Sequence, residues 1–366
     1  MIRLRAGLVR AVLDERPGLV ELSVEVEGAE ARAVAYPDLT GPVAPGDRVQ
    51  LNTTAVDLAL GTGGVHFVLA VEGQRDLDPP PEGHVMKLRY TPLQVKVRAA
   101  EEQGGPDREA VAGSAGLAGL PVIWAPLHSM VGAATAGALA AGAERVVHVM
   151  TDGGALPAAF SRQLHELRAT GLLDAVVTAG QAFGGDHEAV NLFSGLLVAK
   201  EVAGAEVVVV ADGPGKVGTG TTWGTSDVAG GLALVAAHVL GGRPVATLRL
   251  NFADPDYRHY GVSPHSLTVL REVAVIPVHV AVPALDDEER RVVWNALRGA
   301  GLEDRHQLVE ATGQPALELL EARGVSADTM GWTLAEEPAF FLAAGAAGTL
   351  AGRMAVQDRH WRPEPA

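Results

Sequence analysis

The sequence predicts an α/β protein with a small N-terminal β-barrel-like domain and a mostly parallel, three-layer α/β sheet domain with Gly-rich loops. Short alternating apolar and polar runs, separated by Gly and Pro, fill the first 73 residues. From Leu120 onward, apolar strands alternate with helical segments, which predicts a parallel sheet covered on both faces. With 366 residues, 48% of them hydrophobic, the chain is long and apolar enough for two cores.

The predicted barrel-like domain spans residues 1–75. Close spacing of short strands is typical of small barrels and sandwiches. We expect its strands at Leu19–Val26, Ala31–Tyr36, Arg48–Leu51 and Val65–Val71. Residues 76–110 are predicted to be a linker. It begins with the Pro-rich run Asp76–Gly83 and continues in His84–Val97, expected to be an extended strand that bridges to the second domain.

The predicted α/β domain spans residues 111–366. Its strands are expected at Pro121–Pro126, Arg145–Met150, Ala175–Ala179, Glu206–Ala211, Val245–Phe252, Ala274–Val282 and Gln307–Glu310. The helices are expected at Val131–Ala141, Pro157–Thr170, Glu188–Val202, Asp227–Leu240, Pro264–Val273, Asp287–Gly299, Pro315–Arg323 and Ala339–Met354. Right-handed crossovers then bring every strand-to-helix loop to one edge of the sheet.

Composition excludes several kinds of chemistry. The formal net charge of −15 disfavours binding to a nucleic-acid phosphate backbone, although a local cationic pocket for a small anion remains a candidate. The absence of cysteine removes thiol nucleophiles, thiolate metal sites and disulfides. The N-terminus has no continuous apolar run of a secretory signal. The apolar segment Ala339–Ala355 is short for a membrane span and contains Arg353, so we expect a buried helix and a cytoplasmic protein.

Five polar or Gly-rich loops follow the predicted strands, where open α/β sheets bind ligands. The strongest is Asp212–Ser226, in which Gly213, Gly215 and Gly218 satisfy G-x-G-x-x-G. Backbone N–H groups of such a loop can turn toward an anion. The candidate ligand-binding residues here are Gly213, Gly215, Lys216, Gly218, Thr219 and Thr221. The predicted helix starts too late for a dinucleotide-binding fingerprint. A P-loop needs Ser or Thr after its lysine, but Val217 follows Lys216. The loop therefore supports neither nicotinamide dinucleotide binding nor nucleoside triphosphate binding.

The other loops supply titratable groups. Asp152, Asp186 and His187 are candidates for acid–base or metal-binding work, although a helix N-cap with acidic first-turn residues is the better explanation of Asp186 and His187 taken alone. Gln181, His128 and Arg258 are further candidate ligand contacts. His128 and Ser129 are only sequence neighbours, and no G-x-S-x-G elbow is present. No metal-binding motif occurs in the sequence. A metal site built from residues of several loops would need these loops to converge in space. Whether the protein binds a metal or a cofactor therefore stays open.

Several runs resemble an uncharacterised bacterial family, a domain of unknown function with no established activity. They are Gly61–Gly64, Met86–Pro92, Val149–Gly153, Thr178–Asp186, Gly213–Gly215 and Gly218–Thr221. The resemblance covers nearly the whole chain and implies no catalytic residue. Because one of these runs lies outside the α/β loops, it adds Lys87 and Arg89 as residues expected to lean toward the site.

Two hypotheses of function remain open. In the first, the protein is a binder or enzyme for a small anionic metabolite carrying phosphate or carboxylate. In the second, it is a non-catalytic scaffold or regulatory protein that binds a protein partner. Its Ala- and Gly-rich helices suit close packing between subunits, and we expect a homo-oligomer.

Overall fold

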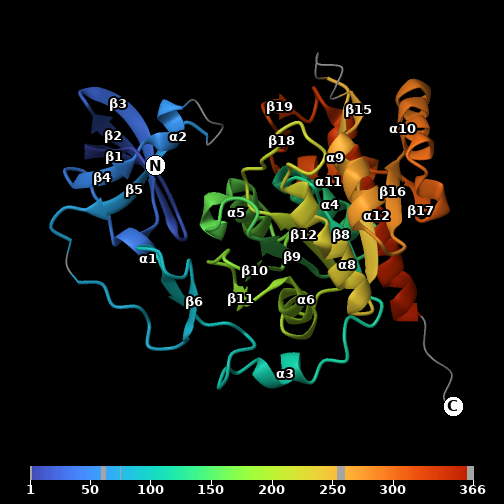
Figure 1. Ribbon diagram of the computed structural model, residues 1–366, viewed down its shortest axis with the longest axis horizontal. Coiled ribbons are helices and arrows are strands. Elements are labelled where there is room, and N and C mark those ends of the chain that lie inside the picture. Colours follow the sequence, from blue (N-terminus) through green and yellow to red (C-terminus); the bar gives the residue numbers. More distant parts are fainter. Residues whose placement is uncertain (1, 59–62, 75, 254–259, 361–366) are drawn as a thin grey trace. The chain divides into compact units, whose positions relative to one another are not determined.

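The chain forms two compact units, Met1–Val97 and Arg98–Ala366 (Figure 1). The structure is a computed structural model that describes residues 2–58, 63–74, 76–253 and 260–360, with the side chains of 358–360 outside this description. The boundary between the units falls inside the predicted linker.

The first unit contains a closed barrel with the strand order β1-β2-β3-β5-β4, which confirms the predicted barrel. The strands are β1 (Leu4–Arg16), β2 (Leu19–Val26), β3 (Ala29–Ala35), β4 (Arg48–Asn52) and β5 (Val65–Val71). The barrel closes because β1 pairs antiparallel with both β2 and β4, while β3 and β5 pair in parallel. The short helices α1 (Pro37–Thr40) and α2 (Thr54–Asp57) lie in its connections.

The long strand β1 was not predicted. Its pairing with β2 shifts register between Val9 and Ala11 and again between Val12 and Asp14. These irregularities break the simple alternation by which a half-buried strand is recognised. Inside the barrel the buried side chains come from all five strands and are mainly valine and leucine.

The predicted bridging strand His84–Val97 is wrong as a single strand. It forms an antiparallel hairpin of β6 (Val85–Lys87) and β7 (Val95–Val97). Leu88 and Tyr90 have φ values of 52° and 61°, so the chain reverses after β6. A left-handed backbone at non-Gly residues gives no signal in a propensity-based prediction.

The second unit is built on an eight-stranded sheet of order β11-β10-β9-β12-β8-β13-β16-β17. Every pair of neighbours is parallel, which agrees with the predicted, mostly parallel sheet. The strands are β8 (Pro121–Trp124), β9 (Val146–Thr151), β10 (Ala175–Ala179), β11 (His187–Ala189), β12 (Val207–Asp212), β13 (Arg243–Thr247), β16 (His279–Pro283) and β17 (Gln307–Ala311). Two small two-stranded sheets pair β14 (Leu250–Asn251) with β15 (Gly261–Val262) and β18 (Asp328–Thr329) with β19 (Trp332–Thr333).

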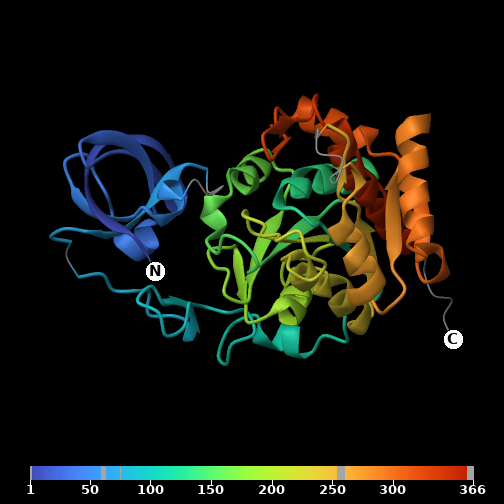
Figure 2. The ribbon, with the colours of Figure 1, turned by 45° about the horizontal axis from the view of Figure 1, so that its top comes forward.

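Helices cover both faces of this sheet (Figure 2). One face carries α4 (Val131–Ala140), α5 (Arg162–Ala169), α11 (Gln314–Ala322) and α12 (Pro338–His360). The other carries α3 (Arg108–Ala112), α6 (Leu192–Glu201), α8 (Leu232–Val239), α9 (Pro264–Thr268) with the π-helical turn Val269–Val273, and α10 (Asp287–Gly299). The short helix α7 (Asp227–Gly230) precedes α8. This arrangement confirms the predicted α/β fold.

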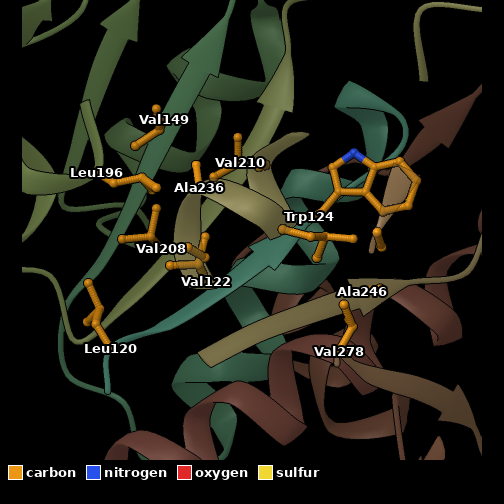
Figure 3. Close-up of a cluster of buried hydrophobic side chains, with 14 of the residues drawn as sticks. Leu120, Val122, Trp124, Val149, Leu196, Val208, Val210, Ala236, Ala246 and Val278 are labelled. Atoms are coloured by element: carbon orange, nitrogen blue, oxygen red, sulfur yellow. The ribbon is translucent and has the colours of Figure 1, made fainter. Parts of the chain in front are cut away.

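The apolar core lies on both sides of the central strands. On β12, Val208 and Val210 face the side covered by α8, whereas Val207 and Val209 face the side covered by α4. Figure 3 shows the first side, where these valines lie with Val122 and Trp124 of β8. A strand buried on both faces reads as a continuous apolar run, which is why the four valines of β12 were recognised.

Helix α12 is buried in the second unit. Its segment Pro338–Gln357 has the length and mean hydropathy of a membrane span, but 78% of its apolar stretch is buried. A Cβ on Gly348 would lie 2.1 Å from the carbonyl oxygen of Ala134, and one on Gly137 would lie 2.3 Å from that of Gly345. Glycines therefore allow α4 and α12 to pack backbone against backbone, as expected of a core helix.

The predicted helix Glu188–Val202 starts too early. His187–Ala189 forms β11 beside β10, and α6 begins only at Leu192. Asn191 caps this helix, since its side chain accepts a hydrogen bond from Ser194 N and the Ser194 hydroxyl accepts one from Asn191 N. A three-residue edge strand is too short to show a period of two.

Candidate functional site

The chain changes direction at the centre of the sheet. The connections that leave β8 and β9 run through α4 and α5 on one face, whereas the connection that leaves β12 runs through α7 and α8 on the other. Strand β12 lies between β8 and β9, so neighbouring loops diverge at its C-terminal end. Open α/β sheets bind ligands at such a switch point, and the candidate site is built here.

Asp212, the last residue of β12, is the centre of this site and is only 4% exposed. Its Oδ1 accepts hydrogen bonds from Thr151 Oγ1 at 2.6 Å and from Gly153 N at 3.2 Å. A Cβ on Gly153 would lie 2.5–2.6 Å from the carboxyl atoms, so a side chain at this position would displace the Asp212 carboxyl group. The end of β9 is thereby fastened to the end of β12.

Lys216 lies between two buried carboxylates. Its Nζ donates to Asp212 Oδ2 at 3.2 Å and lies 2.6 Å from Oδ1 of Asp227, the first residue of α7. The side chains of both aspartates are 4% exposed and that of Lys216 is 15% exposed. Two carboxyl groups contact the one ammonium group, so the cluster is not a purely cationic cradle.

His128, in the loop after β8, also contacts the end of β12. Its Nδ1 donates to the Asp212 carbonyl oxygen at 2.9 Å, because a carbonyl can only accept. Its Nε2 therefore accepts from the Ser161 hydroxyl at 2.7 Å. Ser161 also caps α5 by accepting from Leu164 N at 3.1 Å. Both ring nitrogens are occupied, so His128 positions the end of β12.

Burial lowers the pKa of His128 to about 4, against smaller opposing effects of the Asp212 carbonyl and carboxylate. The ring of His148 on β9 packs edge-on against it at 5.6 Å. Burial, with a contribution from His128, lowers the pKa of His148 to about 3. His148 Nδ1 donates to the Val209 carbonyl, while its buried Nε2 has no partner among the described residues. Both rings are therefore neutral near pH 7.

Asp152 stays at the C-terminal edge. Its exposed carboxylate accepts a hydrogen bond from Gln181 N at 2.8 Å, which joins the loops after β9 and β10. Gly180 makes this contact possible, since it has a φ of 69° and a Cβ there would lie 2.3 Å from Asp152 Oδ2. Gln181 takes part through its backbone.

Asp186 and His187 lie elsewhere. Asp186 Oδ2 accepts from Val176 N at 2.8 Å at the start of β10, and its other oxygen pairs with Arg168 at 2.9 Å. His187 is opposite Val177 in the parallel pairing. Val176 and Gly180 are four residues apart along the chain, which is about 13 Å in an extended strand. Asp152 accepts its hydrogen bond from Gln181, next to Gly180. The structure thus does not bring Asp186 and His187 together with Asp152, because the loop after β10 folds back along its own strand.

The Gly-rich loop folds on itself. Gly218 pairs with Thr225, and the Thr219 hydroxyl bonds that of Thr221 at 2.9 Å, so the candidate threonine hydroxyls are used within the loop. Gly213 is packed against the chain, since a Cβ there would lie 2.0 Å from Ala155 O. By contrast, Gly215 has a φ of 106°, and a Cβ on it would have none of the described neighbouring atoms within 4 Å.

Lys87, Arg89 and Arg258 are the remaining candidates. Lys87 on β6 is buried and Arg89 is exposed, and both belong to the first unit. Arg258 lies outside the described residues. Across residues 2–58, 63–74, 76–253 and 260–360, no group of three or more His, Asp or Glu side chains could hold a metal ion.

The candidate residues predicted from the sequence do not include Asp212, Asp227 or Ser161, which belong to this cluster. In the sequence, Asp212 is an acidic residue after an apolar strand and Asp227 is an acidic residue at the start of a predicted helix. Both are ordinary capping patterns. A fourth residue, Trp124, ends β8 beside them and reads as core in the sequence.

The fold and this cluster together define the chain as an α/β sheet protein with a buried Lys–Asp cluster at its topological switch point. It belongs to the family described as a protein of unknown function (DUF3866), whose model matches residues 32–348. This match confirms the resemblance to a domain of unknown function. No curated protein and no solved structure matches the chain.

Proposed function

We propose that this protein binds a small metabolite bearing a phosphate or carboxylate group at the C-terminal edge of β12, with Lys216 as the cationic contact. The position of the Lys216 ammonium between Asp212 and Asp227 carries this proposal. Burying charged groups is unfavourable unless they are paired, and such clusters concentrate at functional sites. Here two buried carboxylates fix one cation at the edge where α/β sheets bind ligands.

The local geometry leaves room for a ligand. Two contacts occupy Lys216, and an ammonium group has three N–H bonds. The open Cβ position of Gly215 leaves its backbone uncovered beside the lysine. Asp152, exposed at the same edge, is the acid–base candidate that would act if the bound metabolite is also a substrate. We place the protein in the cytoplasm, and its acidic charge favours a small anion over nucleic acid.

A thermal-shift screen tests the proposal. Purified protein is heated with inorganic phosphate, phosphate monoesters and small carboxylates, beside the Lys216→Met variant and a Lys200→Met control. Lys200 lies on α6, where it pairs with Glu201. A ligand at about 100 times its Kd stabilises the fold by about 2.7 kcal/mol. The proposal requires a shift that Lys200→Met keeps and Lys216→Met loses, with Lys216→Met/Asp227→Asn used if the single variant does not fold. No shift from any compound would overturn it.

Exposed apolar residues favour a second candidate, a scaffold that binds a partner or another copy of the chain. Val217 is 62% exposed and Trp223 is 60% exposed, both on the Gly-rich loop. Exposed aromatic side chains of this kind are enriched at protein interfaces. Sedimentation of wild type and Trp223→Ser measures the assembly state. This candidate requires the variant to dissociate or to lose its partner.

A further inference from the structure

Residues 217–226 of the Gly-rich loop form a small hairpin (the hairpin loop) that bonds mainly to itself. Ser226 N donates to Val217 O at 2.9 Å, and Thr219 N donates to Gly224 O at 2.8 Å. Within the described part of the chain, no residue from 217 to 224 hydrogen-bonds outside the hairpin loop. The hairpin loop can therefore move as a unit without breaking its own bonds.

The chain is fixed on both sides of the hairpin loop. Before it, Pro214 O accepts a hydrogen bond from Ala155 N at 2.7 Å. After it, the buried residue Asp227 begins α7. A Cβ on Gly215 or on Gly220 would have no described neighbouring atom within 4 Å. Neither the residue that leads into the hairpin loop nor the turn at its tip is thus packed against the sheet domain.

The hairpin loop holds apolar side chains in solvent. Residues 217–223 are all exposed, and the largest of them, Trp223, is 60% exposed while Val217 is 62% exposed. A Cβ on Gly218 would have only His265 Nε2 within 4 Å, at 3.4 Å, so contact with α9 is slight. Burial of apolar side chains is favourable, and the hairpin loop would gain this energy by closing over a ligand.

One side chain ties the hairpin loop at its base. Lys216, the residue before it, lies 2.6 Å from Asp227, the residue after it, and 3.2 Å from Asp212 on β12. We propose that the hairpin loop is a flap latched by the Lys216–Asp227 ion pair, which closes Val217 and Trp223 over the apolar part of the ligand. This rests on the proposed function, because an anion bound to the third N–H of Lys216 lies at the base of the flap. The ligand class is thus a small anion with an apolar or aromatic group.

Hydrogen exchange tests the latch without a ligand. Exchange at residues 217–226 is followed by mass spectrometry for wild type, Asp227→Asn and an Asp287→Asn control. Asp287 is likewise the first residue of a helix, α10, and is exposed. Neutralising Asp227 removes a charge-assisted contact, so we expect the hairpin loop to exchange about tenfold faster while β12 keeps its wild-type rates. Lys216→Met/Asp227→Asn should give the same result, and replaces the single variant if that variant does not fold.

Two phosphate monoesters test the closure. Phenyl phosphate and methyl phosphate carry the same charged group and differ in an aromatic ring. Their Kd values are measured by calorimetry for wild type, Trp223→Ser and a Val275→Ser control, since Val275 is 71% exposed in the connection that enters β16. We expect phenyl phosphate to bind at least about tenfold more tightly, and Trp223→Ser alone to remove most of this preference. Saturation with phenyl phosphate should also slow the exchange of the hairpin loop.

The outcomes separate this proposal from the proposed function. Wild-type exchange rates in Asp227→Asn overturn the latch, whatever the probes bind. Equal Kd values for the two probes, unchanged by Trp223→Ser and lost in Lys216→Met, overturn the closure and leave the anion site standing. Binding of neither probe overturns closure over this ligand class, and the thermal-shift screen then decides the proposed function alone. Exchange that slows with protein concentration and not with phenyl phosphate overturns the flap in favour of an interface between copies of the chain.

Discussion

Nζ of Lys216 lies 2.6 Å from Oδ1 of Asp227, and this contact joins the Gly-rich loop to the first residue of α7. The same ammonium donates to Asp212 at the end of β12. One lysine therefore links the last residue of a central strand, the loop that follows it and the helix beyond. A ligand that moved the Lys216 ammonium would therefore alter the contacts of the strand, the loop and the helix.

The cluster predicts a non-additive stability effect. Lys216→Met leaves two buried carboxylates facing each other, so we expect the free energy of unfolding to fall by about 3 kcal/mol. Adding Asp227→Asn removes one of them and should recover part of that loss. Urea unfolding measures both variants, with Lys200→Met expected to change stability by less than about 1 kcal/mol. A double variant less stable than Lys216→Met would contradict this account of the cluster.

The buried histidines predict a loss of stability in mild acid. The pKa of His128 is about 4 and that of His148 about 3 when folded, against about 6.5 in the unfolded chain. Below pH 6.5 protons therefore bind the unfolded chain first, so stability falls as the pH is lowered toward these values. Each histidine contributes about 2 kcal/mol of this loss between pH 7 and pH 5.

Urea unfolding at pH 7 and pH 5 checks this prediction. His148→Gln should flatten the pH dependence, whereas His238→Gln, at an exposed position on α8, should not. If both variants lose stability with pH as steeply as wild type, the buried histidines do not control the acid sensitivity.

The contact between α4 and α12 should tolerate no side chain at Gly348. Its Cβ would lie 2.1 Å from a backbone oxygen that cannot rotate away, so we expect Gly348→Ala to lower the melting temperature by several degrees. Gly299→Ala is the matched helix substitution in open space and should be neutral or stabilising by up to about 1 kcal/mol. Similar melting temperatures for the two variants would show that these helices can separate without loss.

Asp186 should act in folding rather than in ligand binding. Its carboxylate accepts from Val176 N, and its ion pair with Arg168 is more than a third exposed. Asp186→Ala should therefore cost about 1 kcal/mol, mainly from the hydrogen bond. Any ligand that shifts the melting temperature of wild type should shift that of Asp186→Ala equally. Loss of the ligand response in a folded Asp186→Ala variant would return this residue to the site.

The local sequence determined the elements that have a clear apolar period. Leu19–Val26, Val65–Val71 and Asp287–Gly299 have the predicted bounds because their apolar period and terminal residues decide their structure. The buried valines of β12 likewise predicted a strand covered on both faces, and alternating strands and helices predicted a parallel sheet. Each of these signals is contained in a few neighbouring residues.

The tertiary structure alone decided which charged groups meet. Asp186 follows β10 in sequence but lies at the start of that strand, because the loop folds back to add β11. Lys216, Asp212, His128 and Trp124 come together because β12 lies next to β8 in the sheet, although the two strands are far apart in the chain. Strand order depends on long-range packing. A short stretch of sequence therefore does not show how close two loops from distant parts of the chain lie in space.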